Sequence, residues 1–139
     1  MIALCGKTAS GKNTIRDELV EMGYIPIVTY TTRPMREGEI DGETYHYILE
    51  EDFMKKKEAD FFAETTSYNV ATGETWYYGT SIESLNSDNG VIILNPYGLM
   101  EIKKNKSINI TAYYIMADEE TIWNRLRSRG DSAEEARRR

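Results

Sequence analysis

The sequence predicts an α/β fold built around a mostly parallel sheet. Apolar, strand-like runs alternate with helix-like segments along the 139 residues, and a glycine-rich turn joins the first strand to the first helix. The run at 90–95 is apolar almost throughout, which is typical of the buried centre of a parallel sheet. The middle third departs from this alternation, and we expect it to form a small antiparallel flap beside the main sheet.

The first third of the chain contains two predicted strands with a helix between them. Residues 1–6 form a short apolar strand that ends in glycine, and residues 24–30 form the second strand. Residues 11–23 form the helix, whose apolar positions recur at helical spacing: Ile15, Leu19 and Met22. A polar loop that carries a proline and two glycines follows.

The middle third begins with a strand at 45–49. Residues 50–59 predict a helix, because acids come early and lysines late, as the helix dipole favours. Residues 60–69 and 74–79 are extended runs joined by turn-forming residues, so we expect a hairpin.

The last third predicts further alternating elements. They are a short helix at 80–87, a strand at 90–95, a helix at 96–106, a strand at 108–116, a helix at 118–130 and the start of another helix at 131–139. Thr80 or Ser81 would cap the first of these helices, and Pro96 opens the second. Asp118 caps the helix whose predicted core positions are Ile122, Trp123 and Leu126.

Composition excludes several classes of protein. The length is that of one domain, and the net charge of −6 argues against non-specific binding to nucleic acid or to an anionic membrane. One cysteine and one histidine exclude a disulfide framework and make a zinc site or a Ser-His-Asp triad a poor fit. The sequence has no signal-peptide pattern and no apolar run of membrane-spanning length, so we expect a cytoplasmic protein. Oligomeric state stays open.

The stretch CGKTASGKNT, residues 5–14, fits the phosphate-loop pattern G-x-x-x-x-G-K between a strand and a helix. Glycines let the backbone N–H groups turn toward phosphate oxygens, the helix N-terminus adds partial positive charge, and lysine adds a full charge. The predicted phosphate-binding residues are Gly6, Ala9, Ser10, Gly11, Lys12, Asn13 and Thr14.

Asn13 departs from the commonest form of this loop. In many such loops a Ser or Thr after the lysine holds magnesium, whereas here the hydroxyl comes one residue later, at Thr14. The loop resembles that of nucleoside monophosphate kinases, in which Thr14 matches a retained threonine and Asn13 a permissive position. This resemblance implies a magnesium ion near Thr14.

The segment VTYTTRPMREGEIDGETYHYI, residues 28–48, closely resembles the GMP-binding signature of guanylate kinases, T-T-R-x-x-R-x-G-E-x-x-G-x-x-Y. The matching residues are Thr31, Thr32, Arg33, Arg36, Gly38, Glu39, Gly42 and Tyr45. Two arginines three positions apart present planar, forked donors that suit a dianionic phosphate. We expect Glu39 to orient these arginines rather than contact the substrate.

The resemblance implies a complete GMP site: Thr29, Arg33, Arg36, Tyr45, Glu64, Tyr78 and Thr80. Tyr78 lies in WYYGT, which is similar to a second phosphate-contacting segment of the family. Guanine needs an acceptor for its N1–H and 2-amino groups, and Glu64 is the candidate, although the strictest alignment selects Ala63. The hairpin that follows is several residues longer than is typical.

The C-terminal stretch NRLRSRGDSAEEARRR resembles the arginine-rich kinase lid. The resemblance implies four catalytic residues: Lys12, Arg125, Arg129 and one of Arg137, Arg138 and Arg139, of which we select Arg138. One marker differs, because Asn95 and Tyr97 stand where guanylate kinases usually carry an aspartate-bearing segment. That difference affects the expected base selectivity and rate rather than phosphate binding.

The resemblance implies one three-layer, P-loop-type domain over residues 1–139. Its expected parts are a core at 1–30 and 88–124, a GMP-binding region at 31–87 and a lid at 125–139. The family normally continues beyond the lid, so the chain is either a shortened version or a piece of a longer one. A truly short chain would have an incomplete adenine pocket and poor ATP affinity.

The implied activity is transfer of the ATP γ-phosphoryl group to GMP or dGMP, which gives ADP and the nucleoside diphosphate, with Mg²⁺ as cofactor. Two alternatives stay open. One is a related kinase that acts on another nucleotide or a ribose phosphate, which the Asn95 and Tyr97 differences motivate. The other is a non-catalytic, guanylate kinase-like module that binds a phosphorylated ligand.

Overall fold

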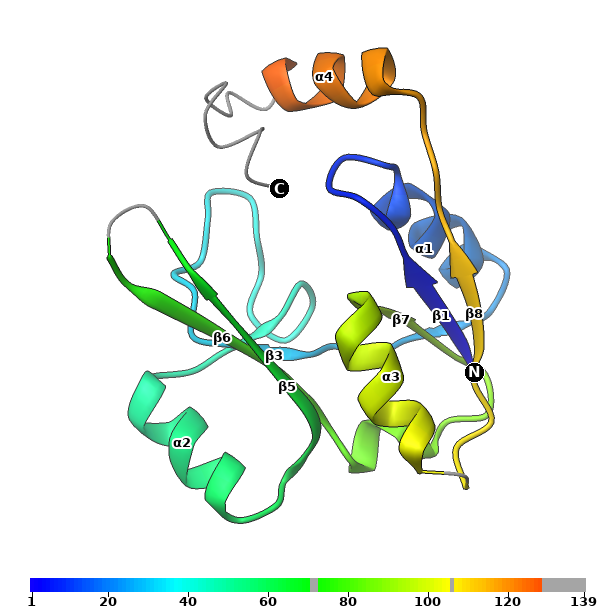
Figure 1. Cartoon of the computed structure of the whole chain (residues 1–139). Coiled ribbons are helices and arrows are strands. Elements are labelled where there is room, and N and C mark those ends of the chain that lie inside the picture. Colours follow the sequence, from blue (N-terminus) through cyan, green and yellow to red (C-terminus); the bar gives the residue numbers. More distant parts are fainter. Residues whose placement is uncertain (71–72, 106, 129–139) are drawn as a thin grey trace.

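The computed structural model describes residues 1–70, 73–105 and 107–128. Two four-stranded sheets lie side by side, with helix α3 (Pro96–Lys104) between them (Figure 1). We call the first sheet and its helices the core and the second sheet with its loops and helix the flap. The predicted α/β fold with a mostly parallel sheet is confirmed.

The core sheet is parallel throughout. Its strands lie in the order β2 (Ile25–Pro26), β7 (Gly90–Ile93), β1 (Ile2–Cys5) and β8 (Thr111–Tyr114). Helix α1 (Lys12–Glu21) lies behind this sheet in Figure 1, and helix α3 lies in front of it, which gives three layers.

Alternating side chains of the central strands form the core. Ala3 and Cys5 of β1 pack with Ile92 of β7 and with Ile102 of α3, and all four are almost fully buried. Leu4 is also buried and points to the opposite face, because successive strand residues alternate. Helix α1 covers that second face less completely, since it has no fully buried residue and Met22 at its C-terminal end is 76% exposed.

The flap sheet has the strand order β4 (His46–Tyr47), β3 (Tyr30–Thr31), β6 (Thr75–Ser81) and β5 (Phe62–Asn69). The β3–β6 and β5–β6 pairs are antiparallel, and β5 and β6 form the predicted long hairpin. The β3–β4 pair is parallel, so the flap is mixed rather than purely antiparallel as predicted. Helix α2 (Glu50–Glu58) packs beside this sheet.

Two predicted elements take a different form in the structure, beyond small shifts of their ends. The single strand predicted at 24–30 is divided between β2 in the core and β3 in the flap, so this run is the crossing point between the two sheets. The helix predicted at 80–87 is a short 3-10 turn, η1 (Glu83–Asn86), because Thr80 and Ser81 are the last residues of β6 rather than caps.

Two predicted helix starts are confirmed. Pro96 is the first residue of α3, and Asp118 caps α4 (Glu119–Ser128) by accepting from the Thr121 backbone N–H at 2.8 Å. Leu126 of α4 is buried as expected, and Ile122 and Trp123 are half-buried. Within the described residues, no helix is long and apolar enough to cross a membrane.

Phe53 anchors the flap, because it is fully buried and its ring stacks on that of Phe62 with centroids 4.6 Å apart. We expect Phe53→Ala to lower the free energy of unfolding by about 3–4 kcal/mol, since it removes buried contacts and leaves a cavity. Urea denaturation would measure the change. Met22→Ala is the matched control and should cost less than about 0.5 kcal/mol. An equal loss in the two variants would contradict the assignment of Phe53 as the anchor.

Candidate functional site

The phosphate loop follows β1 and leads directly into α1. Lys12 is the first residue of the helix, and its Nζ donates back to the carbonyl oxygens of Gly6 at 3.0 Å and Lys7 at 2.6 Å. The ammonium group therefore lies within the turn of the loop. This arrangement concentrates positive charge at the helix N-terminus, where phosphate oxygens bind best.

Two glycines of the loop are required by geometry. Gly6 has φ 147°, and a Cβ there would collide with the Ile115 carbonyl oxygen. Gly11 has φ 102°, a conformation that side-chain-bearing residues rarely adopt. Substitution at either position would change the path of the loop that presents the backbone N–H groups.

Arg125 of α4 contacts the back of the loop. Its Nη1 donates to the Ala9 carbonyl oxygen at 3.0 Å, so the end of α4 is tied to the loop. Ser10, only 5% exposed, has a buried Oγ that makes no hydrogen bond in the described structure. A buried hydroxyl without a partner retains donor capacity that an anion at the loop would satisfy.

The first flap cluster surrounds Arg33, which is only 5% exposed. Arg33 Nη2 donates to Glu39 Oε1 at 2.7 Å, and its guanidinium lies 5.5 Å from the centroid of the Tyr45 ring. Glu39 Oε2 accepts from the Arg36 backbone N–H and from the Tyr47 hydroxyl, each at 2.7 Å. Glu39 thus holds the Arg33 guanidinium, as expected from the sequence, but it contacts Arg36 only through the backbone N–H.

This cluster also sets two ionisation states. Burial would raise the pKa of Glu39, but the hydrogen bonds from Arg33, the Arg36 backbone and Tyr47 outweigh burial and lower the pKa to about 2. Burial raises the pKa of Tyr45, which stays a neutral donor at neutral pH. The cluster therefore carries a fixed carboxylate and a buried arginine next to neutral hydroxyls.

The low pKa of Glu39 makes the fold sensitive to acid. A carboxyl group whose pKa is lowered by folding stabilises the fold. For Glu39 this stabilisation is fully present above the unfolded-state pKa of 4.5 and is lost as the pH falls toward the folded-state pKa of about 2. We expect Glu39→Gln to lower the free energy of unfolding at pH 7 by up to about 3 kcal/mol, with the difference from wild type shrinking across that acid range. Urea titrations at several pH values would measure it. Glu37→Gln, on the same exposed loop, should leave the free energy of unfolding at pH 7 close to that of wild type. A Glu39→Gln deficit that stays constant with pH would contradict the linkage.

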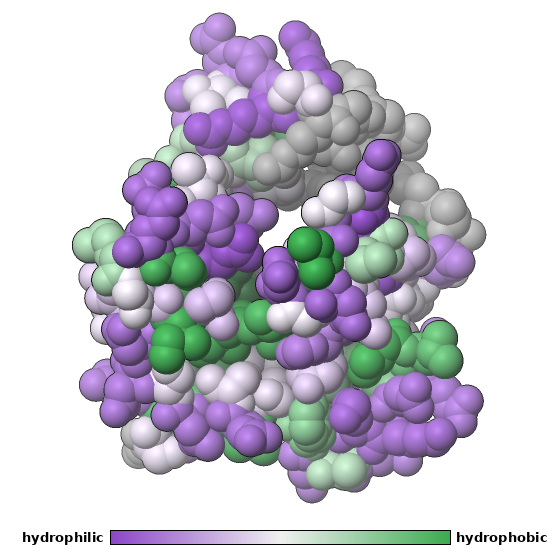
Figure 2. All heavy atoms as spheres, turned by 180° about the vertical axis from the view of Figure 1, so that it is seen from behind, coloured by the Kyte–Doolittle hydropathy of each residue, from purple (hydrophilic) through white to green (hydrophobic). Residues whose placement is uncertain are grey.

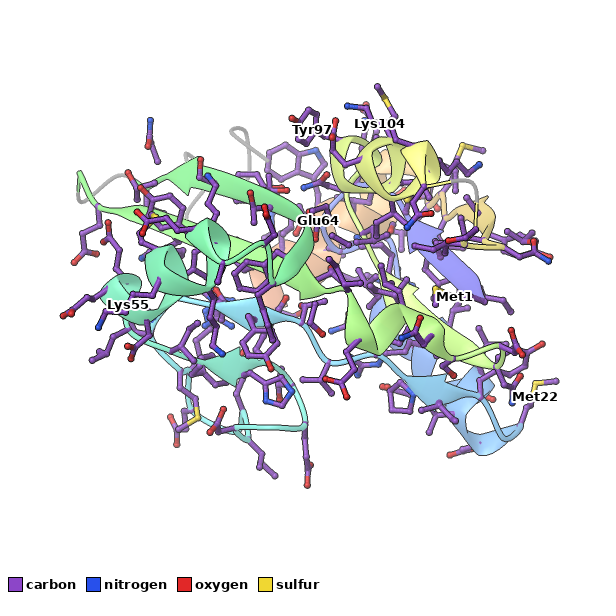
Figure 3. The ribbon with its side chains drawn as sticks, turned by 90° about the horizontal axis from the view of Figure 1, so that it is seen from below. Met1, Met22, Lys55, Glu64, Tyr97 and Lys104 are labelled. Atoms are coloured by element: carbon purple, nitrogen blue, oxygen red, sulfur yellow. The ribbon has the colours of Figure 1, made fainter. Side chains whose placement is uncertain are left out.

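The second flap cluster centres on Glu64 of β5. Thr80 Oγ1 donates to Glu64 Oε1 at 2.6 Å, and Thr66 Oγ1 donates to Oε2 at 3.3 Å. Glu64 is 8% exposed, and burial raises its pKa more than these hydroxyls lower it. In Figure 3 Glu64 lies between the flap strands and α3, whereas Tyr97 points outward from the start of α3. Ala63, the alternative candidate, packs against the hydrophobic core instead.

One cleft of about 660 Å³ joins the phosphate loop to both flap clusters. Figure 2 shows the molecule from behind, where the surface is hollowed between core and flap and largely hydrophilic around the hollow. The predicted site residues that line the cleft are Gly6, Lys12, Asn13, Thr29, Arg33, Arg36, Tyr45, Glu64 and Tyr78.

Other predicted site residues lie elsewhere. The described residues that do not line the cleft are Ala9, Ser10, Gly11, Thr14, Thr80 and Arg125. Of these, Thr80 still contacts Glu64, and Thr14 is exposed while its neighbour Asn13 lines the cleft. Arg129 and Arg138 lie outside the described residues.

The cleft contains residues that the sequence prediction missed. They include Lys7, Thr8, Thr44, Thr66, Tyr68, Asn69, Val70, Trp76, Gly79, Ile93 and Leu94. On the hairpin the missed signal is strand alternation, because Thr66 pairs with Tyr78 and Tyr68 pairs with Trp76 on the face that carries Glu64. Counting in twos from Glu64 and Tyr78 finds Thr66, Tyr68, Val70 and Trp76, whereas Asn69 and Gly79 lie outside this alternation.

A parallel sheet whose first strand leads through a glycine-lysine loop into a helix defines the P-loop class of α/β proteins. Comparison with known proteins then identifies the family. The family model described as guanylate kinase matches residues 1–138, and the chain belongs to the guanylate kinase family.

Curated relatives agree with this assignment. The guanylate kinase of Clostridium tetani is 32% identical over 143 aligned positions, which cover 98% of this chain and 66% of that protein. The guanylate kinase of Sulfurimonas denitrificans is 41% identical over 86 positions, which cover 60% of this chain and 39% of that protein. The chain thus spans just under two thirds, or less, of the length of these relatives.

A solved structure has the same fold. The crystal structure of guanylate kinase from Anaplasma phagocytophilum superposes with a TM-score of 0.71 at 23% identity, covering 90% of this chain and 64% of that one. At this level of identity the likeness establishes the architecture, and the chemistry has to be argued from the residues of the cleft.

Proposed function

We propose that this protein transfers the γ-phosphoryl group of ATP to GMP, giving ADP and GDP. The observation that carries the proposal is the single cleft with Lys12 of the phosphate loop on the core side and Arg33, Tyr78 and Glu64 on the flap side. Each side suits one reactant, because the loop suits a polyphosphate and the flap suits a monophosphate attached to a hydrogen-bonding base.

The flap residues would bind the acceptor. Arg33 and Arg36 line the cleft and would bind the dianionic phosphate, and the hydroxyls of Tyr45 and Tyr78 line the same cleft and would donate to it. Glu64 supplies carboxylate oxygens for the N1–H and 2-amino groups of guanine. Adenine has no N1–H and carries its amino group on C6 instead of C2, so a carboxylate at this position favours guanine.

The core residues would position the donor. Phosphoryl transfer depends mainly on holding the two oxygens in line and on positive charge around the transferred group. Lys12 at the start of α1 provides such a charge, and the loop N–H groups hold phosphate oxygens while the acceptor phosphate approaches from the flap. In this proposal Arg125 supports the loop through its hydrogen bond to the Ala9 carbonyl oxygen. Arg129 and Arg138 are the catalytic arginines of the lid that the sequence predicts.

The loop residues fit a magnesium–ATP complex. Within the described residues no group of three or more His, Cys, Asp and Glu side chains forms a metal site. Magnesium in nucleotide sites is held mainly by phosphates and water, and the Asn13 side chain, which lines the cleft, and the nearby Thr14 offer oxygens for that shell. When bound, the ion would neutralise charge that develops on the phosphates.

The test is ADP formation from ATP with each nucleoside monophosphate in turn. The proposal predicts the highest kcat/KM with GMP, followed by dGMP, and little turnover with AMP, CMP or UMP. Preference for another nucleotide or for a ribose phosphate would replace the assigned acceptor. GMP binding without turnover of any acceptor would instead support a non-catalytic ligand-binding module.

A further inference from the structure

The phosphate loop contains a residue with a strained backbone conformation. The Ser10 N–H donates to the Lys7 carbonyl oxygen at 3.3 Å, which closes a turn over residues 7–10. Ala9 is the third residue of this turn and has φ 57°, a left-handed conformation that turns of this kind usually give to glycine. The Cβ of a left-handed residue lies too close to the carbonyl oxygen that follows it. The turn therefore needs contacts that offset the strain at Ala9.

The hydrogen bond of the turn itself is a weak hold. Its 3.3 Å length is long for a bond between an amide and a carbonyl, and the Lys7 carbonyl oxygen also accepts from Lys12 Nζ at 2.6 Å. Turning over the peptide between Thr8 and Ala9 would give Ala9 an ordinary negative φ and would reverse the direction of the Ala9 N–H group. Anion binding by such loops depends on where their N–H groups point. Relief of the strain would therefore disturb the site for phosphate.

Arg125 provides a second hold from the back of the loop. Its Nη1 donates to the Ala9 carbonyl oxygen at 3.0 Å, so the peptide between Ala9 and Ser10 is bound at both its carbonyl and its N–H. The same nitrogen would lie 3.3 Å from a Cβ on Gly11, which shows how closely the guanidinium packs against the loop. Neither Arg125 nor Ala9 lines the cleft, whereas Thr8 does. Arg125 therefore contacts the loop on the side away from the cleft.

Helix α4 presents Arg125 from a fixed position. In Figure 1 this helix lies beside the loop that joins β1 to α1. Asp118 caps its start, and Leu126, the neighbour of Arg125, is only 2% exposed. An arginine on an anchored helix can therefore fix the position of the loop carbonyl.

We propose that Arg125 is a positioning residue for the donor nucleotide: its hydrogen bond to the Ala9 carbonyl keeps the strained turn of the phosphate loop in the conformation that receives the phosphates of ATP. This inference rests on the proposed function, because it assigns the loop to ATP. It also changes the role that the sequence predicts for Arg125, which acts through the loop rather than by contact with the transferred phosphoryl group.

A double-mutant cycle of Arg125→Met and Ala9→Gly tests this proposal. Glycine adopts a positive φ without strain, so a turn with glycine at position 9 no longer needs the arginine. We expect Arg125→Met alone to raise the calorimetric Kd for Mg²⁺–ATP about tenfold, because the competent loop becomes a minor conformation. In the Ala9→Gly background the same substitution should raise that Kd by less than about twofold. In steady-state kinetics the loss should appear in the KM for ATP rather than in kcat.

Two controls separate the turn from charge and from folding. Arg127→Met removes the same charge from an exposed position on the same helix and should bind Mg²⁺–ATP like wild type. Ala9→Gly also removes a buried methyl group, so urea denaturation of every variant measures that separate cost to stability. The deciding quantity is the effect of Arg125→Met on ATP binding in one background compared with the other.

The outcomes distinguish this inference from the proposed function. Wild-type protein that fails to bind Mg²⁺–ATP would overturn both, whereas transfer to an acceptor other than GMP would overturn only the proposed function. An equal loss of ATP binding in the two backgrounds, or no loss in either, would overturn the inference alone. A large loss of kcat in both backgrounds would assign Arg125 to the transition state instead, and an Arg125→Met protein that does not fold would assign it to the fold. A loss of ATP binding that Ala9→Gly removes supports the inference.

Discussion

The Lys12→Ala variant is expected to lose at least about 100-fold in kcat while it still binds GMP. The Lys12 ammonium group lies within the phosphate loop, where it donates to the Gly6 and Lys7 carbonyl oxygens. That charge is needed most when negative charge builds up on the transferred phosphoryl group, so its loss affects the transition state more than acceptor binding.

Steady-state kinetics and GMP calorimetry on the same preparation would test the Lys12 prediction. Lys55→Ala on the exposed surface of α2 is the matched control and should leave both quantities unchanged. Full turnover by Lys12→Ala would contradict the role of the loop. Loss of GMP binding in parallel with turnover would show instead that Lys12 shapes the acceptor side of the cleft.

Glu64→Gln is expected to weaken GMP binding by about 100-fold. The amide has one oxygen in place of two, and its NH₂ group would face the donor groups of guanine, so at least one buried polar group is left unpaired. Folding raises the pKa of Glu64. A carboxyl group whose pKa is raised by folding makes the fold less stable as the pH rises above the pKa of that group in the unfolded chain. The variant should therefore be at least as stable as wild type at pH 7.

Calorimetry with GMP and urea denaturation at pH 7 would measure both effects of Glu64→Gln. Glu51→Gln on the exposed face of α2 should change neither. GMP binding close to that of wild type would mean that another group reads the base. A large loss of stability would mean that Glu64 serves the fold rather than the ligand.

The phosphate loop was predictable from sequence because its chemistry is local. Gly6, Gly11 and Lys12 are fixed by spacing, and a strand before them and a helix after them complete the pattern. Arg33 and Glu39 were also found from spacing along a single loop, and the structure adds that they form a 2.7 Å ion pair.

The hairpin side of the cleft was only partly predictable because it depends on pairing between distant residues. Tyr68 and Trp76 face the cleft through the register of β5 against β6, and Asn95 meets Tyr68 across 27 positions of sequence. Asn95 differs from the family pattern in sequence, but its hydrogen bonds to Thr66 and Tyr68 depend on tertiary contacts that no local motif encodes.

The division of the run at 24–30 between two sheets was missed for a related reason. Its apolar residues predict an extended strand correctly, but local pattern does not say which sheet each half joins. β2 pairs with β7 in the core and β3 pairs with β6 in the flap, and both partners come more than 40 positions later. Tertiary pairing therefore placed the boundary between core and flap.

We propose that the two flap clusters together form a guanine-specific monophosphate site. Calorimetric titration of the protein with GMP, AMP, CMP and UMP, without ATP, tests it most directly. We expect saturable binding of one GMP per chain, with an affinity at least about 100-fold higher than for any of the other three nucleotides. Equal affinity for AMP and GMP, or no saturable binding of GMP, would contradict it.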